Sequence, residues 1–338
     1  MGFASIAPHL PWLQNKFQLT ESEMGLMLLC HAIGAVTMML VAGRVIHSFG
    51  SRLPVIVGGC LLILLLPLVF WLDQIPIMSS FHGLWSLGAM SGGATATFAL
   101  TMGFTPLQHV AFSSLILTMI LGVSSFSMIP SSQEEKGEKT PLLVRPSGKV
   151  LSLGLLCLLG MVSEGTAVDW SAIYSSSVLG ATPSQAALTF TIFTMTMMIG
   201  RLTGDWVILK VGRVQLVRFT AALGAIGLGV GLVWGTTFSA WLGFACLGFG
   251  LANIVPIMFG EASRIPGVSA GNGIAGVATL GYCGFLLGPP TIGFLAELIG
   301  LQGALGLIVV FCVILGIFGP GMLSQNKTTK NQSELPSG

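Results

Sequence analysis

Long apolar runs separated by short polar or glycine-rich turns dominate this chain. Runs of about 20 mostly apolar residues are long enough to cross the hydrocarbon core of a bilayer as helices. The pattern predicts roughly ten such spans, at 22–43, 54–72, 77–103, 107–128, 150–174, 184–203, 214–234, 237–260, 269–296 and 301–322. We therefore expect an all-α, polytopic membrane protein.

Two segments interrupt this pattern. Residues 131–149 are charged and punctuated by Pro and Gly, which is typical of a flexible linker. Residues 323–338 are polar and predict a disordered tail. The expected organisation is an N-terminal helical bundle at 1–130, the linker at 131–149, a six-helix bundle at 150–322 and the tail.

Composition supports the membrane assignment. The chain is 53% hydrophobic and only 8% charged, whereas soluble domains are about 25% charged. A net charge of +2 gives no indication of a nucleic-acid partner. The six cysteines all lie in apolar runs without CxxC or Cys/His spacing, so we expect no metal and no cofactor. The expected partners are the lipid bilayer and a small-molecule substrate.

The cations set an expected orientation. Arg and Lys gather after the first and sixth spans, in the linker and in the tail, whereas 175–185, 234–239 and 297–303 carry none. By the positive-inside rule the basic loops and the C-terminus are cytoplasmic. The loop at 44–52 and the linker are then on the same side, so an even number of spans must join them. Only three apolar runs do so, so either one span inserts in a non-standard way or the chain has lost a helix there.

The two halves share a loop motif. AGRVIHSFGSR (42–52) follows the first span and TGDWVILKVGR (203–213) follows the sixth. Each begins with a small residue and Gly and ends with Gly and Arg, and each is expected in a short cytoplasmic loop. Repeats in two helical halves joined by a long loop are typical of secondary transporters.

Here the chain resembles the major facilitator superfamily, in its bacterial YbjJ/MosC-like branch. The resemblance is carried by PIMSSFHGLWSLGAMSGG (76–93), EGTAVDWSAIY (164–174), GRLTGD (200–205) and GNGIAGVATLGYCGFLLGPPTIGFLAE (271–297). It implies a two-bundle fold of twelve helices, here without most of helix 1 and without helix 4 near Asp73. It also implies a monomeric transporter of the bacterial inner membrane.

Two carboxylates in the fifth span are the first candidates for function. Glu164 lies roughly 20 Å into that span at 1.5 Å per residue. Intramembrane carboxylates are costly and usually face a wet cavity or a partner, so Glu164 is a candidate for binding substrate or protons. The alternative is a structural hydrogen bond. Asp169, beside Trp170 and nearer the outer surface, is a weaker candidate that solvation or helix anchoring would also explain.

Three further residues are pathway candidates. His82 and Trp85 share a helix face, where they would bind substrate or simply pack. Asn253 lies three residues before Pro256, near an expected helix break. It would line the pathway or bond another helix.

The loop motifs supply gating candidates: Arg44, Arg52, Arg201, Asp205 and Arg213. Arg201 and Asp205, four apart, are expected to pair at a cytoplasmic helix end. The resemblance implies that such loops brace one state of the transport cycle. The opposing interpretation is a turn whose charges set topology.

A glycine- and proline-rich stretch in the ninth span predicts a helix break. It comprises Gly284, Gly288, Pro289 and Pro290. Proline removes a backbone hydrogen bond, so this stretch is expected to form a hinge or cavity wall. Close packing of small residues alone is the alternative.

These patterns favour a secondary active transporter of a small polar solute, such as a sugar- or inositol-like compound, working by alternating access. Coupling to protons, as symport through Glu164, is the expected energy source. The alternative is a non-transporting membrane sensor or a degenerate transporter paralogue, because the N-terminal half is short of helices. HExxH and Walker motifs are missing from the sequence, so we do not expect an enzyme.

Overall fold

The structure is a computed structural model that describes residues 10–26, 28, 29, 90–125 and 148–332. Five of the expected site and loop features lie outside these residues: His82, Trp85, Arg44, Arg52 and the place of the missing helix near Asp73.

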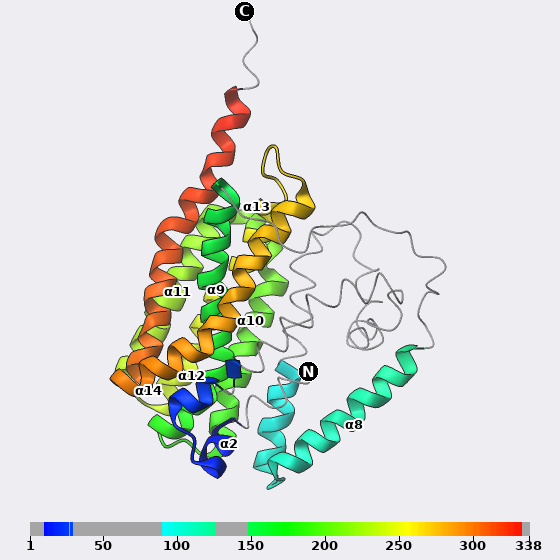
Figure 1. Ribbon diagram of the computed structural model, residues 1–338, viewed down its shortest axis with the longest axis vertical. Helices are drawn as coiled ribbons and strands as arrows, with labels where there is room; N and C mark the ends of the chain where they lie inside the picture. Colours follow the sequence, from blue (N-terminus) through cyan, green and yellow to red (C-terminus); the bar gives the residue numbers. More distant parts are fainter. Residues whose placement is uncertain (1–9, 27, 30–89, 126–147, 333–338) are drawn as a thin grey trace, which may run out of the picture.

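The C-terminal half is a bundle of antiparallel helices (Figure 1). Its elements are α9 (Gly148–Ile173), the π-helical turn η3 (Tyr174–Val178), α10 (Pro183–Val211), α11 (Arg213–Trp234), α12 (Thr237–Leu251), α13 (Ile254–Ala262) and α14 (Ala270–Gln332). Within the described part of the chain no residue forms a strand, and five helical stretches are long and apolar enough to cross a membrane. The expected all-α, polytopic fold is confirmed.

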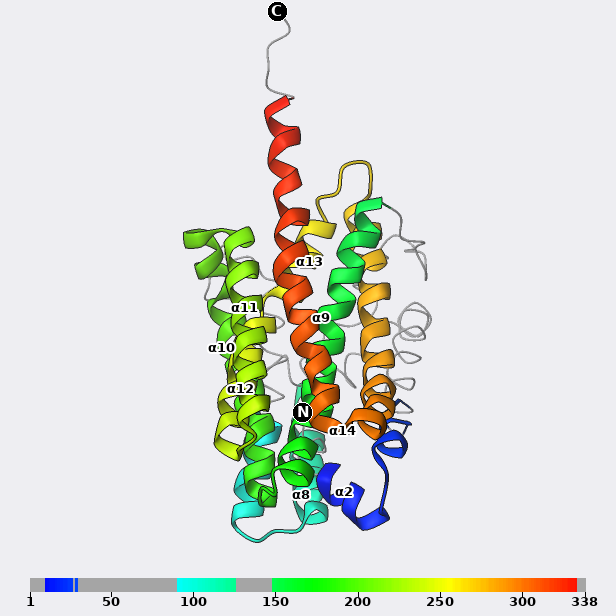
Figure 2. The same ribbon diagram turned by 90° about the vertical axis from the view of Figure 1, so that its left-hand side faces the viewer.

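Helix α14 is too long for a single crossing. Gly300 interrupts it with φ 76° and ψ 156°, a conformation that glycine adopts without steric cost. The two arms lie on either side of this kink and run back through the bundle (Figures 1 and 2). With α12 and α13 forming one stretch and α14 divided at Gly300, residues 148–323 hold six helical stretches, and the division of the chain into domains stays a prediction. The second arm stays helical to Gln332, within the segment that the sequence assigns to the tail.

Local sequence signals end the other helices. Thr182 caps α10 through a reciprocal capping box with Gln185 and precedes Pro183 at the first helical position. Thr236 forms the same box with Ser239 ahead of α12. Gly212, with φ 80°, separates α10 from α11. These turns define two ends of the bundle.

We call them the basic end and the opposite end. The basic end carries Lys149, Lys210, Arg213 and Arg264. The opposite end carries the turns at 179–182 and 235–236 and the kink at Gly300. In Figure 1 the basic end is uppermost.

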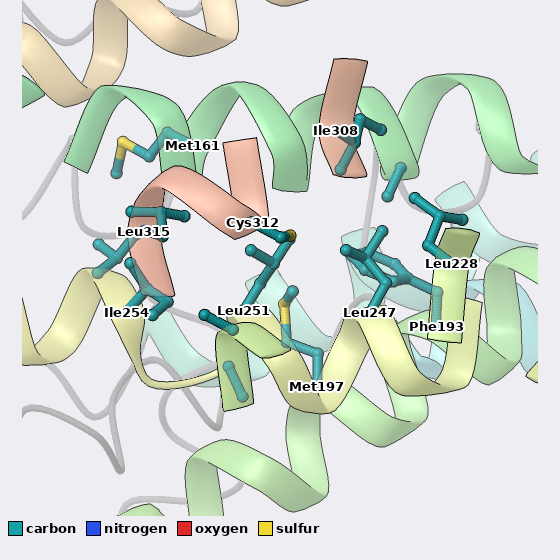
Figure 3. Close-up of a cluster of buried hydrophobic side chains, with 14 of the residues drawn as sticks. Met161, Phe193, Met197, Leu228, Leu247, Leu251, Ile254, Ile308, Cys312 and Leu315 are labelled. Carbon is teal, nitrogen blue, oxygen red and sulfur yellow. The ribbon is translucent and has the colours of Figure 1, made fainter. Parts of the chain in front are cut away.

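The core lies where five helices meet (Figure 3). Met161 of α9, Phe193 of α10, Leu228 of α11, Leu247 of α12 and Ile308 of α14 are all buried there. Because lipid is as apolar as these side chains, close packing rather than exclusion from water holds such a bundle together.

The described N-terminal segments meet this bundle at its opposite end (Figures 1 and 2). Helix α2 (Leu10–Phe17) packs against α9. The helical residues 21–26, 28 and 29 pack on the first arm of α14, and the helical segment 90–101 lies beside α10, where Thr97 and Thr191 hydroxyls are 3.2 Å apart. Helix α8 (Pro106–Ser125) follows that segment.

Candidate functional site

A buried ion pair joins α9 to α10. One terminal nitrogen of the Arg201 guanidinium donates to both carboxylate oxygens of Glu164, at 2.9 and 3.0 Å. The Arg201 side chain is 2% exposed and that of Glu164 is 10% exposed. Removing one partner of such a pair leaves an uncompensated charge in a medium of low dielectric constant, which typically costs about 3–5 kcal/mol. The sequence flagged both residues but did not predict that they bind each other.

The position of Arg201 corrects the expected loop. Helix α10 continues to Val211, so the stretch from Gly200 to Lys210 is helical and the turn is confined to Gly212. Arg201 lies inside the bundle because Glu164 neutralises its charge there. Asp205 lies one helical turn further along, half-buried. Its pairing with Arg201 stays a prediction.

A break in the next crossing supplies a second partner for Arg201. Helix α12 ends at Leu251 and α13 begins at Ile254. Pro256 has no N–H, so the carbonyl of Ala252 loses the donor that a continuous helix would provide. The Nε–H of Arg201 donates to that carbonyl at 3.2 Å instead. The guanidinium therefore joins a side chain of α9 to the broken backbone between α12 and α13.

Asn253 completes this network, which we call the Arg201 network: Glu164, Arg201, Ala252 and Asn253. The Asn253 Nδ2 donates to the carbonyl of Gly200 at 2.9 Å. Its Oδ1 is buried without a hydrogen-bond partner and lies against Gly204, where a Cβ would collide with it. Of the two roles that the sequence left open for Asn253, bonding to another helix is observed. Lining the pathway stays a prediction.

Asp169 has very different surroundings from Glu164, although both belong to α9. Its side chain is buried, and within the described residues it forms neither an ion pair nor a hydrogen bond. Two neighbours, the Thr166 hydroxyl and the Trp170 indole N–H, are also buried without partners. The sequence placed Asp169 near the outer surface with Trp170 as an interface anchor. Trp170 is instead 0% exposed, because α9 turns this face into the bundle.

The stretch of α14 that contains Gly284, Gly288, Pro289 and Pro290 packs on α9. The predicted helix break is wrong, since the only non-helical backbone in α14 is at Gly300. A Cβ on Gly284 would lie 2.8 Å from the Leu158 carbonyl, so close packing is observed here. A hinge role stays a prediction.

A second ion pair lies at the basic end. Arg213, at the first position of α11, donates to Glu261 of α13 at 2.7 Å, and Arg264 lies 3.8 Å from the same carboxylate. The sequence singled out Arg213 but missed Glu261. The available signal was a lone carboxylate at the end of an apolar run. Among the described residues, no group of three His, Cys, Asp or Glu side chains is placed to hold a metal ion.

Similarity to known proteins identifies the family. The membrane protein MosC of Rhizobium meliloti is 31% identical to the chain, over 92% of this chain and 84% of its own length. This chain belongs to the major facilitator superfamily. An uncharacterised MFS-type transporter of Yersinia pestis is 29% identical over 92% and 89%, and the transporter y4wD of Sinorhizobium fredii is 26% identical over 93% and 92%. No family model matches the chain.

Membership of the superfamily explains why the chain has two helical halves. In its transporters two helical bundles rock about a central site. The alignment with the Yersinia transporter spans 344 positions, more than the 338 residues of the chain, so that relative carries residues without a counterpart here. The chain is a multi-pass bacterial membrane protein and a transporter by family.

Proposed function

We propose that the chain is a secondary active transporter that moves a small polar solute by alternating access, with the Arg201 network as part of the solute site. The solute class that fits is polyhydroxylated, such as a sugar or an inositol derivative. The energy source is a proton gradient. The chain acts as a monomer in the inner membrane with its basic end and C-terminus in the cytoplasm.

One observation carries this proposal: a buried arginine contacts a carboxylate and a freed backbone carbonyl where a membrane-crossing helix is broken. Solute sites in secondary transporters commonly form at discontinuous helices near the middle of the bilayer. Intramembrane charges are costly, so they are retained mainly where they serve function or pair with one another. Glu164 and Asn253 would add an acceptor and an amide for hydroxyl groups.

The network also suggests how a solute would be released. Each polar group in it already has a protein partner except the Asn253 Oδ1. A hydroxylated solute would exchange these bonds one for one, which keeps its affinity modest. Modest affinity favours turnover, since tight binding of substrate does not speed its passage.

The experiment is solute uptake into proteoliposomes that contain the purified protein. A panel of radiolabelled sugars, inositols and amino acids is offered with and without an inward proton gradient. We expect uptake of at least one polyhydroxylated solute, stimulated by the gradient. Asn253→Ala should weaken its apparent affinity by about tenfold, the loss of one to two hydrogen bonds. Gly260→Ala, at a position with no neighbour within 4 Å of the added Cβ, is the control.

The competing function is a membrane sensor or a degenerate transporter paralogue. Stabilisation of the purified protein by a solute, without flux of that solute into proteoliposomes, would favour it. Absence of both binding and flux across the whole panel would contradict the transporter proposal.

A further inference from the structure

Helix α9 carries a second carboxyl group that the Arg201 network does not use. Asp169 lies five residues beyond Glu164, about 140° further around the helix, so the two side chains point to different neighbours. Glu164 is neutralised by Arg201. Asp169 has no such partner within the described residues.

The neighbour of Asp169 follows from the register of α9 against α14. A Cβ on Gly165 would meet the Phe285 ring, and one on Gly288 would lie 3.5 Å from the Thr166 hydroxyl. Residue numbers rise together along these contacts, so α9 and the first arm of α14 are parallel, and the turn of α9 that holds Asp169 faces the next turn of α14, which contains Ile292. Ile292 is fully buried there.

The opposite face of that turn of α14 contacts the N-terminal half of the chain. A Cβ on Gly25 would lie 2.8 Å from the Pro289 carbonyl and 3.3 Å from the Cα of Gly293. The Ser22 hydroxyl donates to the carboxylate of Glu297. One turn of α14 is therefore held between the Asp169 face of α9 and the helical residues 21–26, 28 and 29.

This contact belongs to the opposite end of the bundle. Other described contacts between the two halves lie at the same end, among them the Thr97–Thr191 contact between the segment 90–101 and α10. Helix α2 covers α9 at the same end. At this end the described residues of the two halves are therefore in contact, and the buried Asp169 lies behind that contact.

Charged and titratable residues on the elements around α9 do not compensate Asp169. Among the side chains that the structure describes, they are Lys149, Cys157 and Glu164 on α9, Tyr174 on η3, Glu21 and Glu23 on the N-terminal segment, Arg201, Asp205 and Lys210 on α10, Cys246 on α12, Glu261 on α13, and Tyr282, Cys283, Glu297 and Cys312 on α14. None of them forms an ion pair or a hydrogen bond with Asp169.

An isolated ionised carboxylate is very costly in surroundings of low dielectric constant, so such a group is neutralised. A proton does this alone. A hard metal cation would need several oxygen ligands in addition.

We propose that the carboxyl group of Asp169 is the proton-binding site of the transporter and that the opposite end closes only when this group is protonated. Closure transfers one proton from water outside the opposite end to a carboxylate oxygen, and the proton leaves to water at the basic end when that end opens. Binding of the proton therefore permits the opposite end of the bundle to pass from its open to its closed state. This inference rests on the proposed function, which supplies the proton gradient, but it can fail separately.

Hydrogen–deuterium exchange tests it without any solute. The purified protein in lipid nanodiscs is exchanged over a range of pH, and peptides covering 19–29 and 287–299 report closure after correction for intrinsic exchange. When closure takes up one proton, the ratio of closed to open protein falls about tenfold for each pH unit above the titration of the open form. We expect protection in acidic buffer and its loss in alkaline buffer.

Variants separate Asp169 from other groups. Asp169→Asn, which mimics the protonated form, should keep both peptides protected at every pH. Glu164→Gln should retain the pH dependence. Gly293→Leu, which crowds the Gly25 contact, should leave the peptides unprotected throughout and shows that the readout follows closure. If Asp169→Asn does not fold, Asp169→Ser is the neutral substitute.

Three results would overturn the proposal. One is protection of the wild type that does not change with pH, and another is pH dependence that survives in Asp169→Asn. The third is restored protection in alkaline buffer on adding sodium, which would assign the group to an alkali cation. Lack of solute flux with an intact pH response would instead defeat the proposed function alone.

Discussion

Glu164 and Asp169 lie on the same helix, yet their environments differ in every respect that matters for charge. Glu164 is held by Arg201 from α10 through two contacts of about 3 Å. Asp169 faces the glycine- and proline-rich stretch of α14 without a partner in the described structure. The difference teaches that depth in the membrane is a poor guide to a carboxylate's role. What neutralises it decides whether it is a fixed or an exchangeable charge.

The largest effect is expected from breaking the Glu164 pair. Arg201→Met leaves Glu164 buried and uncompensated, and should lower the free energy of unfolding by about 3–5 kcal/mol. Replacing both residues, as Glu164→Leu with Arg201→Met, should restore most of that stability, because neither charge remains. Thermal unfolding followed by size-exclusion chromatography measures both. A double variant no more stable than the single one would contradict the fixed-pair interpretation.

A smaller loss of unfolding free energy is expected at the edge of the Arg201 network. Gly204→Ala places a methyl group on the Asn253 Oδ1 and should cost about 1–3 kcal/mol by overpacking. Asn253→Ala in the same chain should relieve it, since the colliding atoms are then gone. The same unfolding assay tests the pair as a double-mutant cycle, with Gly260→Ala as the open-space control. Additive losses would show that Asn253 is not held against α10.

At the contact of the two halves, Gly25→Ala should weaken closure more than it weakens folding. The added methyl group would meet the Pro289 carbonyl, and a shift of the segment 21–29 can relieve it. We expect faster exchange in peptides 19–29 and 287–299 and a change in unfolding free energy below about 1 kcal/mol. Gly288→Ala, whose Cβ would make an ordinary contact at 3.5 Å, is the matched control on α14. Equal effects of the two would argue against a closing surface at Gly25.

The smallest loss of stability is expected at Asp169 itself. Asp169→Asn removes a buried carboxyl group that makes no hydrogen bond within the described structure and that must take up a proton to stay buried, so the free energy of unfolding should not fall. Its effect should appear in transport: uptake driven by a proton gradient is lost, whereas exchange of solute across the membrane persists. Glu164→Gln should impair both. The opposite pattern would return proton coupling to Glu164, as the sequence first suggested.

Much of the fold was predictable because a bilayer leaves few choices. Apolar runs of spanning length must become helices, and Thr182 with Pro183 or the glycine at 212 end them by local geometry. The six helical stretches of residues 148–323 followed from this. The family could also be recognised from the sequence, because the sequence contains motifs such as GRLTGD.

The contacts that side chains make with other helices could not be predicted in this way. The sequence expected Arg201 at a cytoplasmic helix end beside Asp205, because basic residues usually mark the end of a span. It lies within the bundle because Glu164, 37 positions away in the chain, is there to neutralise it. The prolines after Gly288 looked like a break, yet α14 stays helical there and packs on α9, and it is Gly300 that kinks it.

The sequence by itself determined the fold class, the number of C-terminal helical stretches and the two carboxylates worth attention. Only the tertiary structure decided that one carboxylate is paired and the other enclosed without a partner. Periodicity and hydropathy act over a single helix, whereas the charge state of a buried group depends on atoms that other helices bring to it.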